Sequence, residues 1–214
     1  GYLHKIACVD KFVLLDDVQF KKNNYINRVK IRNQVGELWL TVPVSSFSST
    51  EKINNMRIHD KDKSLKKVVN NIKASYSGAD YFKDYIDELE NLIFSATDSL
   101  AELNKKTIIF LMDQFEIDTD LVISSSIDIL KGNGPSDLNM DIVKHLNGER
   151  YLSGVHGKEY LEIDKFSRNG IAVDFQNYKV KPYEQLGSGF ISGLSSLDVL
   201  FNLGPNSPSF FYDR

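Results

Sequence analysis

The sequence is short of the residues that build covalent or metal-held frameworks. Among its 214 residues it has one cysteine, Cys8, and four histidines. A single cysteine cannot form an internal disulfide, which favours a reducing, cytoplasmic compartment. His4, His59, His145 and His156 are scattered, with no H-x-x-x-H or C-x-x-C spacing. The sequence therefore predicts no histidine- or cysteine-held metal site, while a carboxylate magnesium site, which needs few protein ligands, stays open.

A long apolar run and a strong charge bias are also missing. No uninterrupted apolar segment approaches the roughly 20 residues of a transmembrane helix, so no membrane span is predicted. The formal net charge is -3, which argues against a dedicated nucleic-acid-binding protein because such proteins usually carry a strongly basic face. Hydrophobic residues make up 42% and charged residues 26% of the chain, and this ordinary usage predicts one folded domain over residues 1–214.

Hydrophobic periodicity predicts an α/β fold: a mixed, largely parallel sheet flanked by helices, with a helical middle segment over about 62–117. Strands are predicted over 11–15, 27–33, 37–44, 54–60, 119–126, 150–154 and 171–176. Helices are predicted over 2–9, 63–76, 81–94, 99–115, 136–148, 158–170 and 195–204. The turn between 27–33 and 37–44 predicts that these two strands form a hairpin.

Capping residues predict where several helices begin and end. Ser99, with Glu102 three residues later, predicts the start of one helix, and Ser136 the start of another. Gly148 and Gly170 predict two helix ends.

Polar side chains crowd the segment after the strand predicted over 11–15, and ligands in open α/β sheets usually collect at the carboxyl ends of strands. The segment contains Asp16, Asp17, Gln19, Lys21, Lys22, Tyr25, Asn27, Arg28 and Lys30. Arg28 could clamp a carboxylate or phosphate through two hydrogen bonds. Either aspartate could act as a general base or accept hydrogen bonds from sugar hydroxyls. The alternative is a solvated turn followed by a hairpin with surface charges.

The stretch "YLSGVHGKEYLE" places Gly154 and Gly157 on either side of His156. It predicts a tight turn from a strand into a helix that begins near Lys158. Backbone N–H groups from Ser153 to Gly157 would then meet an anionic ligand. Histidine ordinarily titrates near neutrality, so His156 is also a candidate general base. The alternative is a hydrogen-bonded surface histidine.

A third polar segment lies near the end of the chain. Pro182, Tyr183 and Gln185 form a polar and aromatic loop, followed by several glycines. Ser195 and Asp198 come next, at the start of the last predicted helix, and we expect both to act as caps.

Five motifs in this order carry a family resemblance. They are "DKFVLLDDVQFKKNNYINRVKIR", "WLTVPV", "YLSGVHGKEYL", "FQNYKVKPYEQ" and "GFISGLSSLDVLFNLGP". Together they resemble the WbqC-like protein family over nearly the whole chain. Tyr25, Asn27 and Arg28 correspond to an aromatic-x-Asn-Arg motif in which the family more usually has Trp; Tyr keeps the stacking surface but lacks the indole donor.

The resemblance implies a bacterial, cytoplasmic protein of surface-polysaccharide (O-antigen) or sugar-nucleotide biosynthesis. It implies transfer of an acyl or aminoacyl group to an amino sugar or related amine, an inference from pathway context. The family pattern usually begins with a further strand and a Pro-containing element, of which only Gly1-Tyr2 is present here. We therefore expect residues upstream of Gly1. The position of His156 varies in the family, so the flanking glycines carry more weight.

Three functions remain open from the sequence. The first is a small-molecule transferase whose catalytic candidates are Asp16, Asp17 and His156. Its candidate substrate-binding residues are Gln19, Tyr25, Asn27, Arg28, Ser153, Gly154, Gly157, Tyr183 and Gln185, and we expect the segments around Asp16, Ser153 and Tyr183 to line one cleft. The second is a non-catalytic ligand-binding or accessory protein of the same pathway, and the third a nucleotide-handling enzyme. No cofactor, donor, acceptor or oligomeric state follows from the sequence.

Overall fold

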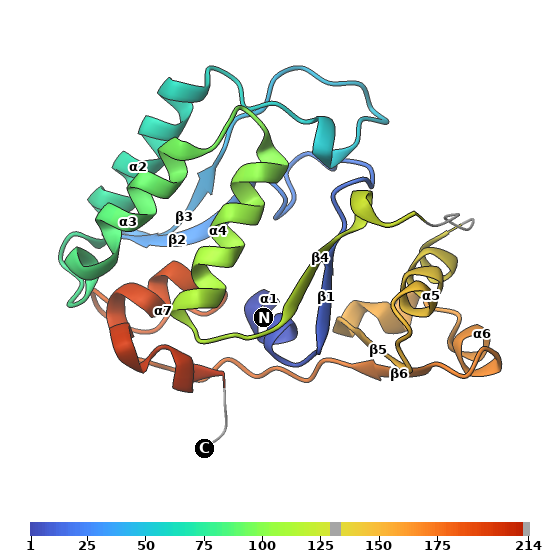
Figure 1. Cartoon of the computed structure of the whole chain (residues 1–214). Coiled ribbons are helices and arrows are strands. Elements are labelled where there is room, and N and C mark those ends of the chain that lie inside the picture. Colours follow the sequence, from blue (N-terminus) through green and yellow to red (C-terminus); the bar gives the residue numbers. More distant parts are fainter. Residues whose placement is uncertain (129–133, 212–214) are drawn as a thin grey trace. The chain divides into compact units, whose positions relative to one another are not determined.

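The structure, a computed structural model, describes residues 1–128 and 134–211. The chain forms two compact units, and each is assembled from two separate segments of the sequence. Unit 1 comprises Gly1–Val13 and Thr119–Lys179, and unit 2 comprises Leu14–Asp118 and the chain from Val180 onward. Helices and strands occur in both units, which confirms the predicted α/β class (Figure 1).

An antiparallel hairpin supplies the sheet of unit 2. Strand β2 (Arg28–Asn33) pairs with β3 (Gly36–Thr41), and Lys30 lies directly opposite Trp39. The connecting turn is closed by the Val35 N–H, which donates to the Asn33 side chain at 3.0 Å. The predicted hairpin is therefore confirmed.

Unit 2 also contains four α-helices, and three of them confirm the helical middle segment. They are α2 (Lys61–Tyr76), α3 (Phe82–Ser95), α4 (Leu100–Gln114) and α7 (Ser196–Leu203). Helices α2 and α7 both contact β2, while α3 contacts α2, α4 and α7 (Figure 1). Within the described ranges, no helix has the length and apolar character needed to cross a bilayer.

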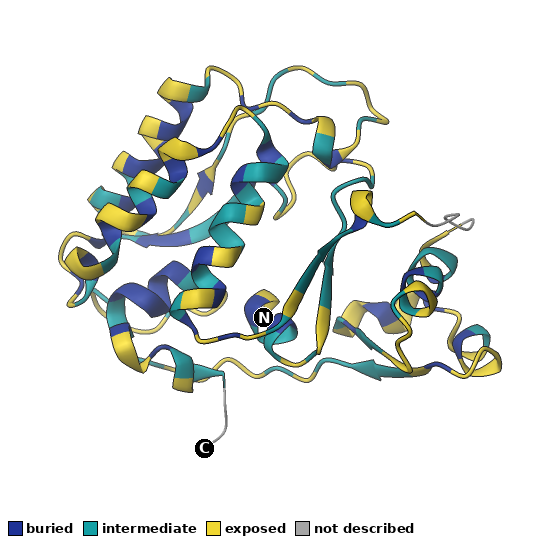
Figure 2. Ribbon diagram, in the orientation of Figure 1, coloured by how far each residue is buried: buried dark blue, intermediate teal, exposed yellow. Residues whose placement is uncertain are grey.

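Helix periodicity sets which faces of these helices are buried. In α2, Leu65, Val69 and Ile72 are almost completely buried, at three- and four-residue spacing. Figure 2 shows buried (dark blue) and exposed (yellow) residues alternating along α2 and α3, whereas α7 is buried over most of its length. The predicted cap of α4 is confirmed, because the Ser99 hydroxyl accepts a hydrogen bond from the Glu102 N–H at 3.3 Å.

A buried arginine joins the hairpin to the loop that precedes α7. Arg32 Nη1 donates to Gln185 Oε1 at 2.9 Å and to the Gly189 carbonyl at 2.9 Å, and Nη2 donates to the Ser188 carbonyl at 2.5 Å. A Cβ built on Gly187 would come within 3.0 Å of Arg32 Nη2, and this residue has φ +92°. The loop therefore needs glycine at position 187, both for its backbone conformation and for its approach to Arg32.

Unit 1 is built on a parallel strand pair, as predicted. Strands β5 (Arg150–Ser153) and β6 (Ala172–Phe175) run parallel, with Ser153 opposite Phe175. The helices of this unit are α1 (Tyr2–Ala7), α5 (Pro135–His145) and α6 (Ile163–Arg168). Helix α5 packs on β5, and α6 packs on β6.

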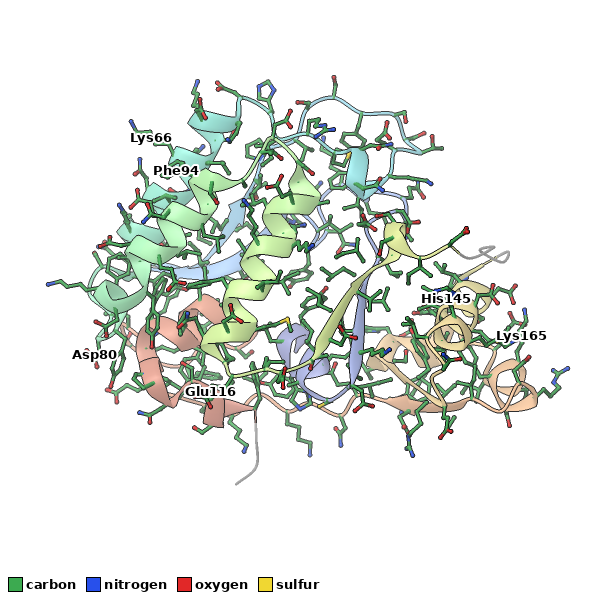
Figure 3. All side chains as sticks on the ribbon, viewed as in Figure 1. Lys66, Asp80, Phe94, Glu116, His145 and Lys165 are labelled. Atoms are coloured by element: carbon green, nitrogen blue, oxygen red, sulfur yellow. The ribbon has the colours of Figure 1, made fainter. Side chains whose placement is uncertain are left out.

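The core of unit 1 lies between these helices and strands. It contains Met140, Leu161, Phe166 and Ile171, all at least nine-tenths buried. At the surface, Lys165 of α6 forms an ion pair with Asp137 of α5 and is labelled in Figure 3. This contact links the two helices that flank the strand pair.

Strand β1 (Lys11–Leu14) pairs with β4 (Asp120–Ile123). In the described part of the chain, the predicted mixture of parallel and antiparallel pairing is thus divided among three two-stranded sheets. The strand predicted over 119–126 is shorter than expected, since Ser124–Ser126 forms a 3-10 turn.

The strand predicted over 54–60 is wrong. Ile53–Asn55 forms a 3-10 turn, and Arg57 and Ile58 make only isolated bridges to Ser99 and Val44. The N–H groups of this segment bond to several different neighbours, including the Val18 and Asp16 carbonyls and, for Ile58, the Asp98 carbonyl. A continuous ladder requires one partner strand, and this segment does not have one.

The predicted boundaries of two helices are also corrected. The helix expected from Lys158 begins at Ile163, because Val155–Glu159 forms a 3-10 helix in which the Gly157 N–H donates to the Gly154 carbonyl. Helix α6 does end as predicted, with Gly170 at φ +72° and the Ile171 N–H bonded to the Phe166 carbonyl.

Helix α5 is not capped by Ser136. Gly134 precedes the helix, and the Ser136 hydroxyl instead accepts a hydrogen bond from the Glu162 N–H at 3.1 Å. The helix stops before Gly148, since Asn147 adopts the left-handed conformation, which asparagine tolerates.

We expect Arg32→Met to lower the free energy of unfolding by roughly 2–5 kcal/mol, because the loop loses three charge-assisted hydrogen bonds from a buried group. Urea denaturation followed by circular dichroism measures this effect. The control is Arg57→Met, which removes an exposed ion pair to Asp98 and should cost less than about 1 kcal/mol. Equal losses in the two variants would show that Arg32 does not anchor the loop.

Candidate functional site

The outer face of the hairpin in unit 2 groups basic and aromatic side chains. Side chains alternate along a strand, so Arg28 and Lys30 of β2 share a face with Trp39 of β3. Arg28 Cζ lies 4.1 Å from the centre of the Trp39 ring, and Lys30 Nζ lies 5.4 Å from it. The Tyr25 ring, which is 63% exposed, lies 5.4 Å from the Trp39 ring centre to centre. We call these four residues the hairpin face.

The two cations of the hairpin face differ in their polar contacts. Lys30 Nζ donates to both carboxylate oxygens of Glu37, at 2.8 and 2.9 Å, and this hydrogen bonding raises the pKa of Lys30. Arg28 Nη2 donates to the Asn23 carbonyl. The charge of Lys30 therefore has a carboxylate partner, whereas Arg28 Nη2 donates to a neutral carbonyl.

Unsatisfied polar atoms lie next to this face. Arg28 Nε and Asn27 Oδ1 are buried and have no hydrogen-bond partner among the described residues, although the Asn27 amide nitrogen donates to the Val42 carbonyl at 3.0 Å. Asn27 is only 9% exposed. Buried polar atoms are nearly always satisfied in proteins, so these two atoms are available to hydrogen-bond a bound molecule next to the exposed rings and cations.

The other candidates from the first polar segment run beside a neighbouring stretch of unit 2. Asp16 and Asp17 are half-buried, and the Asp16 carbonyl accepts from the Asn54 N–H at 2.7 Å. The Gln19 amide donates to the Ser49 carbonyl at 2.5 Å. The Asn54 contact holds the backbone at Asp16, one of the two predicted catalytic aspartates.

Tyr183 and Gln185 belong to a buried hydrogen-bond network in unit 2. The Gln185 amide donates to the Ile191 carbonyl at 3.0 Å and accepts from Arg32. Asp198 is completely buried and accepts from the Tyr183 hydroxyl at 2.5 Å and from the Tyr76 hydroxyl at 3.0 Å.

The prediction that Asp198 caps α7 is therefore wrong. Ser195 is the cap, with its hydroxyl accepting from the Leu197 N–H at 3.3 Å. Burial raises the pKa of Asp198, and the two tyrosine hydrogen bonds and the charge of Arg32 oppose that shift. Burial, followed by the nearby Asp198 charge, raises the pKa of Tyr76. The network is a packed, internally satisfied part of the core.

In unit 1, the glycine-framed turn follows β5 directly. Ser153 is almost completely buried, and its hydroxyl donates to the Gly154 carbonyl at 3.1 Å. The His156 side chain is 85% exposed and lies 3.0 Å from Glu159. Gly157 is buried, and a Cβ there would overlap the Ser153 hydroxyl and come within 3.0 Å of the Leu161 side chain. Gly157 is therefore required for packing.

Helix α1 brings a lysine to this turn. A Cβ built on Gly154 would lie 3.9 Å from Lys5 Nζ, and Lys5 lies 6.0 Å from the centre of the Phe12 ring. Lys5 is half-buried and makes no ion pair or hydrogen bond with the residues that the structure describes. Burial accordingly lowers the pKa of its ammonium group.

His4 and Cys8, one helical turn apart on α1, do not form a nucleophilic pair in this arrangement. The Gln176 amide nitrogen lies 2.8 Å from His4 Nδ1, so Nδ1 accepts and the ring proton sits on Nε2. Both ring nitrogens lie 3.7 Å from Cys8 Sγ. In this tautomer the imidazole has no lone pair left to accept the thiol proton, and partial burial raises the pKa of Cys8.

The sequence-predicted residues divide between the two units. Unit 1 holds Ser153, Gly154, His156 and Gly157, and unit 2 holds Asp16, Asp17, Gln19, Tyr25, Asn27, Arg28, Tyr183 and Gln185. Their convergence on one cleft stays a prediction. Within unit 2, the hairpin brings Tyr25 and Arg28 onto the same indole ring.

Sequence reasoning missed Trp39 and Lys5. The hairpin register could have revealed Trp39, because alternation places it on the face of Arg28 and Lys30. Nothing in the spacing of Lys5 pointed to its position, since that depends on how α1 packs against the end of β5.

These features describe an α/β protein with polar and aromatic residues on a hairpin face and a second polar group at the carboxyl ends of parallel strands, an arrangement common in small-molecule-binding proteins. The chain matches the WbqC-like protein family over residues 1–210, and it belongs to that family. The match includes both units. "Uncharacterized protein Rv1507c" from Mycobacterium tuberculosis (strain ATCC 25618 / H37Rv) is 29% identical over 212 residues, which cover 98% of this chain and 91% of the relative. No solved structure gives a significant match.

The two glycines of the turn should respond differently to alanine. Gly157→Ala should destabilise the protein by roughly 1–3 kcal/mol, because the new methyl group overlaps Ser153. Gly154 has φ -67° and ψ 162°, so Gly154→Ala should leave stability unchanged or raise it by up to about 1 kcal/mol. Urea denaturation compares the two, and a similar loss in both would contradict the packing role of Gly157.

Lys5→Met should raise the melting temperature near pH 7, because it removes a half-buried charge that has no ion-pair partner in the described part of the chain. The pKa of Lys5 is lower in the folded protein than in the unfolded chain. The Lys5 charge therefore destabilises wild type fully at pH values below the pKa in the folded state. This destabilisation disappears as the pH approaches about 10.4, the ordinary lysine pKa. Differential scanning fluorimetry between about pH 7 and pH 10 should therefore show the gain shrinking. A variant less stable than wild type at neutral pH would contradict the prediction.

Proposed function

We propose that the chain is a small-molecule transferase that moves an acyl or aminoacyl group onto an amino sugar or related amine, in cytoplasmic biosynthesis of bacterial surface polysaccharide or sugar nucleotides. The observation that carries this proposal is the Arg28 guanidinium stacked on Trp39 beside the exposed Tyr25. Family membership supplies the pathway context.

The hairpin face has the chemistry needed to hold a phosphorylated sugar. Aromatic planes offer large, rigid surfaces against which the apolar face of a sugar or a nucleobase can stack. A guanidinium binds phosphate through two parallel hydrogen bonds. Arg28 Nε lacks a partner in the described structure, so a bound anion, reached by a small movement of the side chain, would satisfy it.

The transfer itself needs a base. The amine of the acceptor attacks the carbonyl carbon of an activated acyl donor, the new C–N bond forms, and the bond to the leaving group breaks. The amine must lose a proton in this reaction, and a carboxylate within hydrogen-bond distance can accept it. Asp16 and Asp17 are the candidates, because both are half-buried and their segment is held by the Asn54 hydrogen bond.

The direct test is to incubate the purified protein with nucleotide-linked amino sugars and activated acyl donors, including thioesters and aminoacyl esters, and to follow the mixture by mass spectrometry. Transfer adds the mass of the acyl group to the acceptor. Loss of this product in Asp16→Asn or Asp17→Asn, with sugar-nucleotide binding retained, would identify the base.

Arg28→Lys should weaken sugar-nucleotide binding by roughly 1–3 kcal/mol, because lysine cannot form the two-pronged contact and loses the planar stack on Trp39. Isothermal titration calorimetry measures this loss. Arg57→Lys is the matched control, since Arg57 is an exposed arginine paired with Asp98 in the same unit. Equal sugar-nucleotide affinity for wild type and Arg28→Lys would show that Arg28 is only a surface charge.

A non-catalytic accessory role is the alternative, and the buried Asp198 network is the observation that favours it. Tyr183 and Gln185, two of the predicted substrate-binding residues, form hydrogen bonds with other groups of the protein. An accessory protein would bind the sugar nucleotide in calorimetry, yet give no acylated product with any donor class.

A further inference from the structure

Among the residues that the structure describes, Lys5 of unit 1 has no carboxylate partner. It is half-buried on α1, and its ammonium group lies 6.0 Å from the centre of the Phe12 ring. Taking an ammonium group out of water without an anion is unfavourable. A functional group that lowers stability in this way is common at ligand sites.

The position of Lys5 in the fold agrees with a ligand site. Ser153 and Phe175 end the parallel strands β5 and β6, and Gly154 and Gln176 follow them. Helix α1 meets both strand ends, since Lys5 lies beside Gly154 and His4 accepts from Gln176. The carboxyl ends of parallel strands are where α/β proteins bind their ligands.

Gly154 leaves space next to the ammonium group. Its backbone, at φ -67° and ψ 162°, is open to any L-residue, so the backbone conformation does not demand glycine. The nearest described atom to a Cβ built there is Lys5 Nζ, at 3.9 Å. A side chain at this position would therefore occupy the volume beside the charge.

Three described titratable groups around helix α1 do not provide a negative charge for Lys5. His4 and Cys8 lie on α1, and Tyr178 follows β6 and stacks on His4 at 4.4 Å between ring centres. Burial raises the pKa of Cys8 and of Tyr178, so both are neutral at physiological pH. The amide of Gln176 is neutral at every pH.

We propose that Lys5 and Gly154 form a binding site for a small anion, a carboxylate or a phosphate group of a ligand, with the Lys5 ammonium as its counter-charge. A carboxylate would come from an acid or amino acid, and a phosphate from a nucleotide or a phosphorylated coenzyme. Both present negatively charged oxygen acceptors to one ammonium group. This site is separate in sequence from the hairpin face and does not depend on the proposed transfer reaction.

The test follows the Lys5 titration directly. Lysines are labelled by isotopic reductive methylation, the Lys5 signal is assigned with Lys5→Met, and its pKa is measured by NMR in chloride, in acetate and in inorganic phosphate at equal ionic strength. The expected result is a titration below the ordinary lysine value, with an upward shift of about one unit in phosphate or acetate, equivalent to a tenfold preference for the charged form. The anion that produces the larger shift identifies the source.

Two variants make the test specific. Gly154→Val should abolish the shift at Lys5 while the protein still unfolds cooperatively, because the valine side chain fills the space beside the charge. Lys11, exposed on β1, should show no anion effect in any buffer. The proposal is overturned if neither anion moves Lys5, if Lys11 moves equally, or if Gly154→Val retains the shift. The Lys5 titration is measured without a sugar nucleotide or acyl donor, so failure here is distinguishable from failure of the proposed function.

Discussion

The structure of unit 2 depends on one buried guanidinium. Arg32 is on β2 but bonds to Gln185, Ser188 and Gly189, more than 150 residues later in the chain. Its backbone N–H donates to the Tyr76 hydroxyl at 3.0 Å, and that hydroxyl in turn donates to Asp198. One residue thus ties the hairpin to the C-terminal loop through its side chain and to α2 and α7 through its backbone. A charge in this position must be fully hydrogen-bonded, so the loop has little freedom to rearrange.

Much of the fold could be predicted because it rests on local pattern. The long amphipathic helices, the hairpin with its turn, and the parallel pair all follow from periodicity and turn residues. The helix expected from Lys158 begins later because of a tertiary contact. Gly157 packs so closely against Ser153 that a side chain at position 157 would overlap it. The chain forms a 3-10 helix there, and α6 begins only at Ile163. Such packing restrictions cannot be inferred from the spacing of hydrophobic residues in the sequence.

Site residues could be predicted where strand alternation decides which way a side chain points. They could not be predicted where tertiary packing decides it. Alternation indicates that Arg28, Lys30 and Trp39 share a face. Asp198 looks like a helix cap in sequence, since an aspartate in the first turn usually is one, but the fold buries it between two tyrosines. Lys5 has no distinguishing motif, and only the packing of α1 onto the strand ends gives it a role.

The division of the chain between the two units has a consequence for synthesis on the ribosome. The path passes from unit 1 to unit 2 after Val13, returns after Asp118, and leaves again after Lys179. Unit 1 cannot complete its parallel pair until β6 has emerged, and unit 2 cannot form the contacts of α7 with β2, α3 and α4 until the last segment has followed. The surfaces that these late segments cover in the folded protein therefore stay exposed on the nascent chain until synthesis is nearly complete, and exposed apolar surface is prone to aggregate.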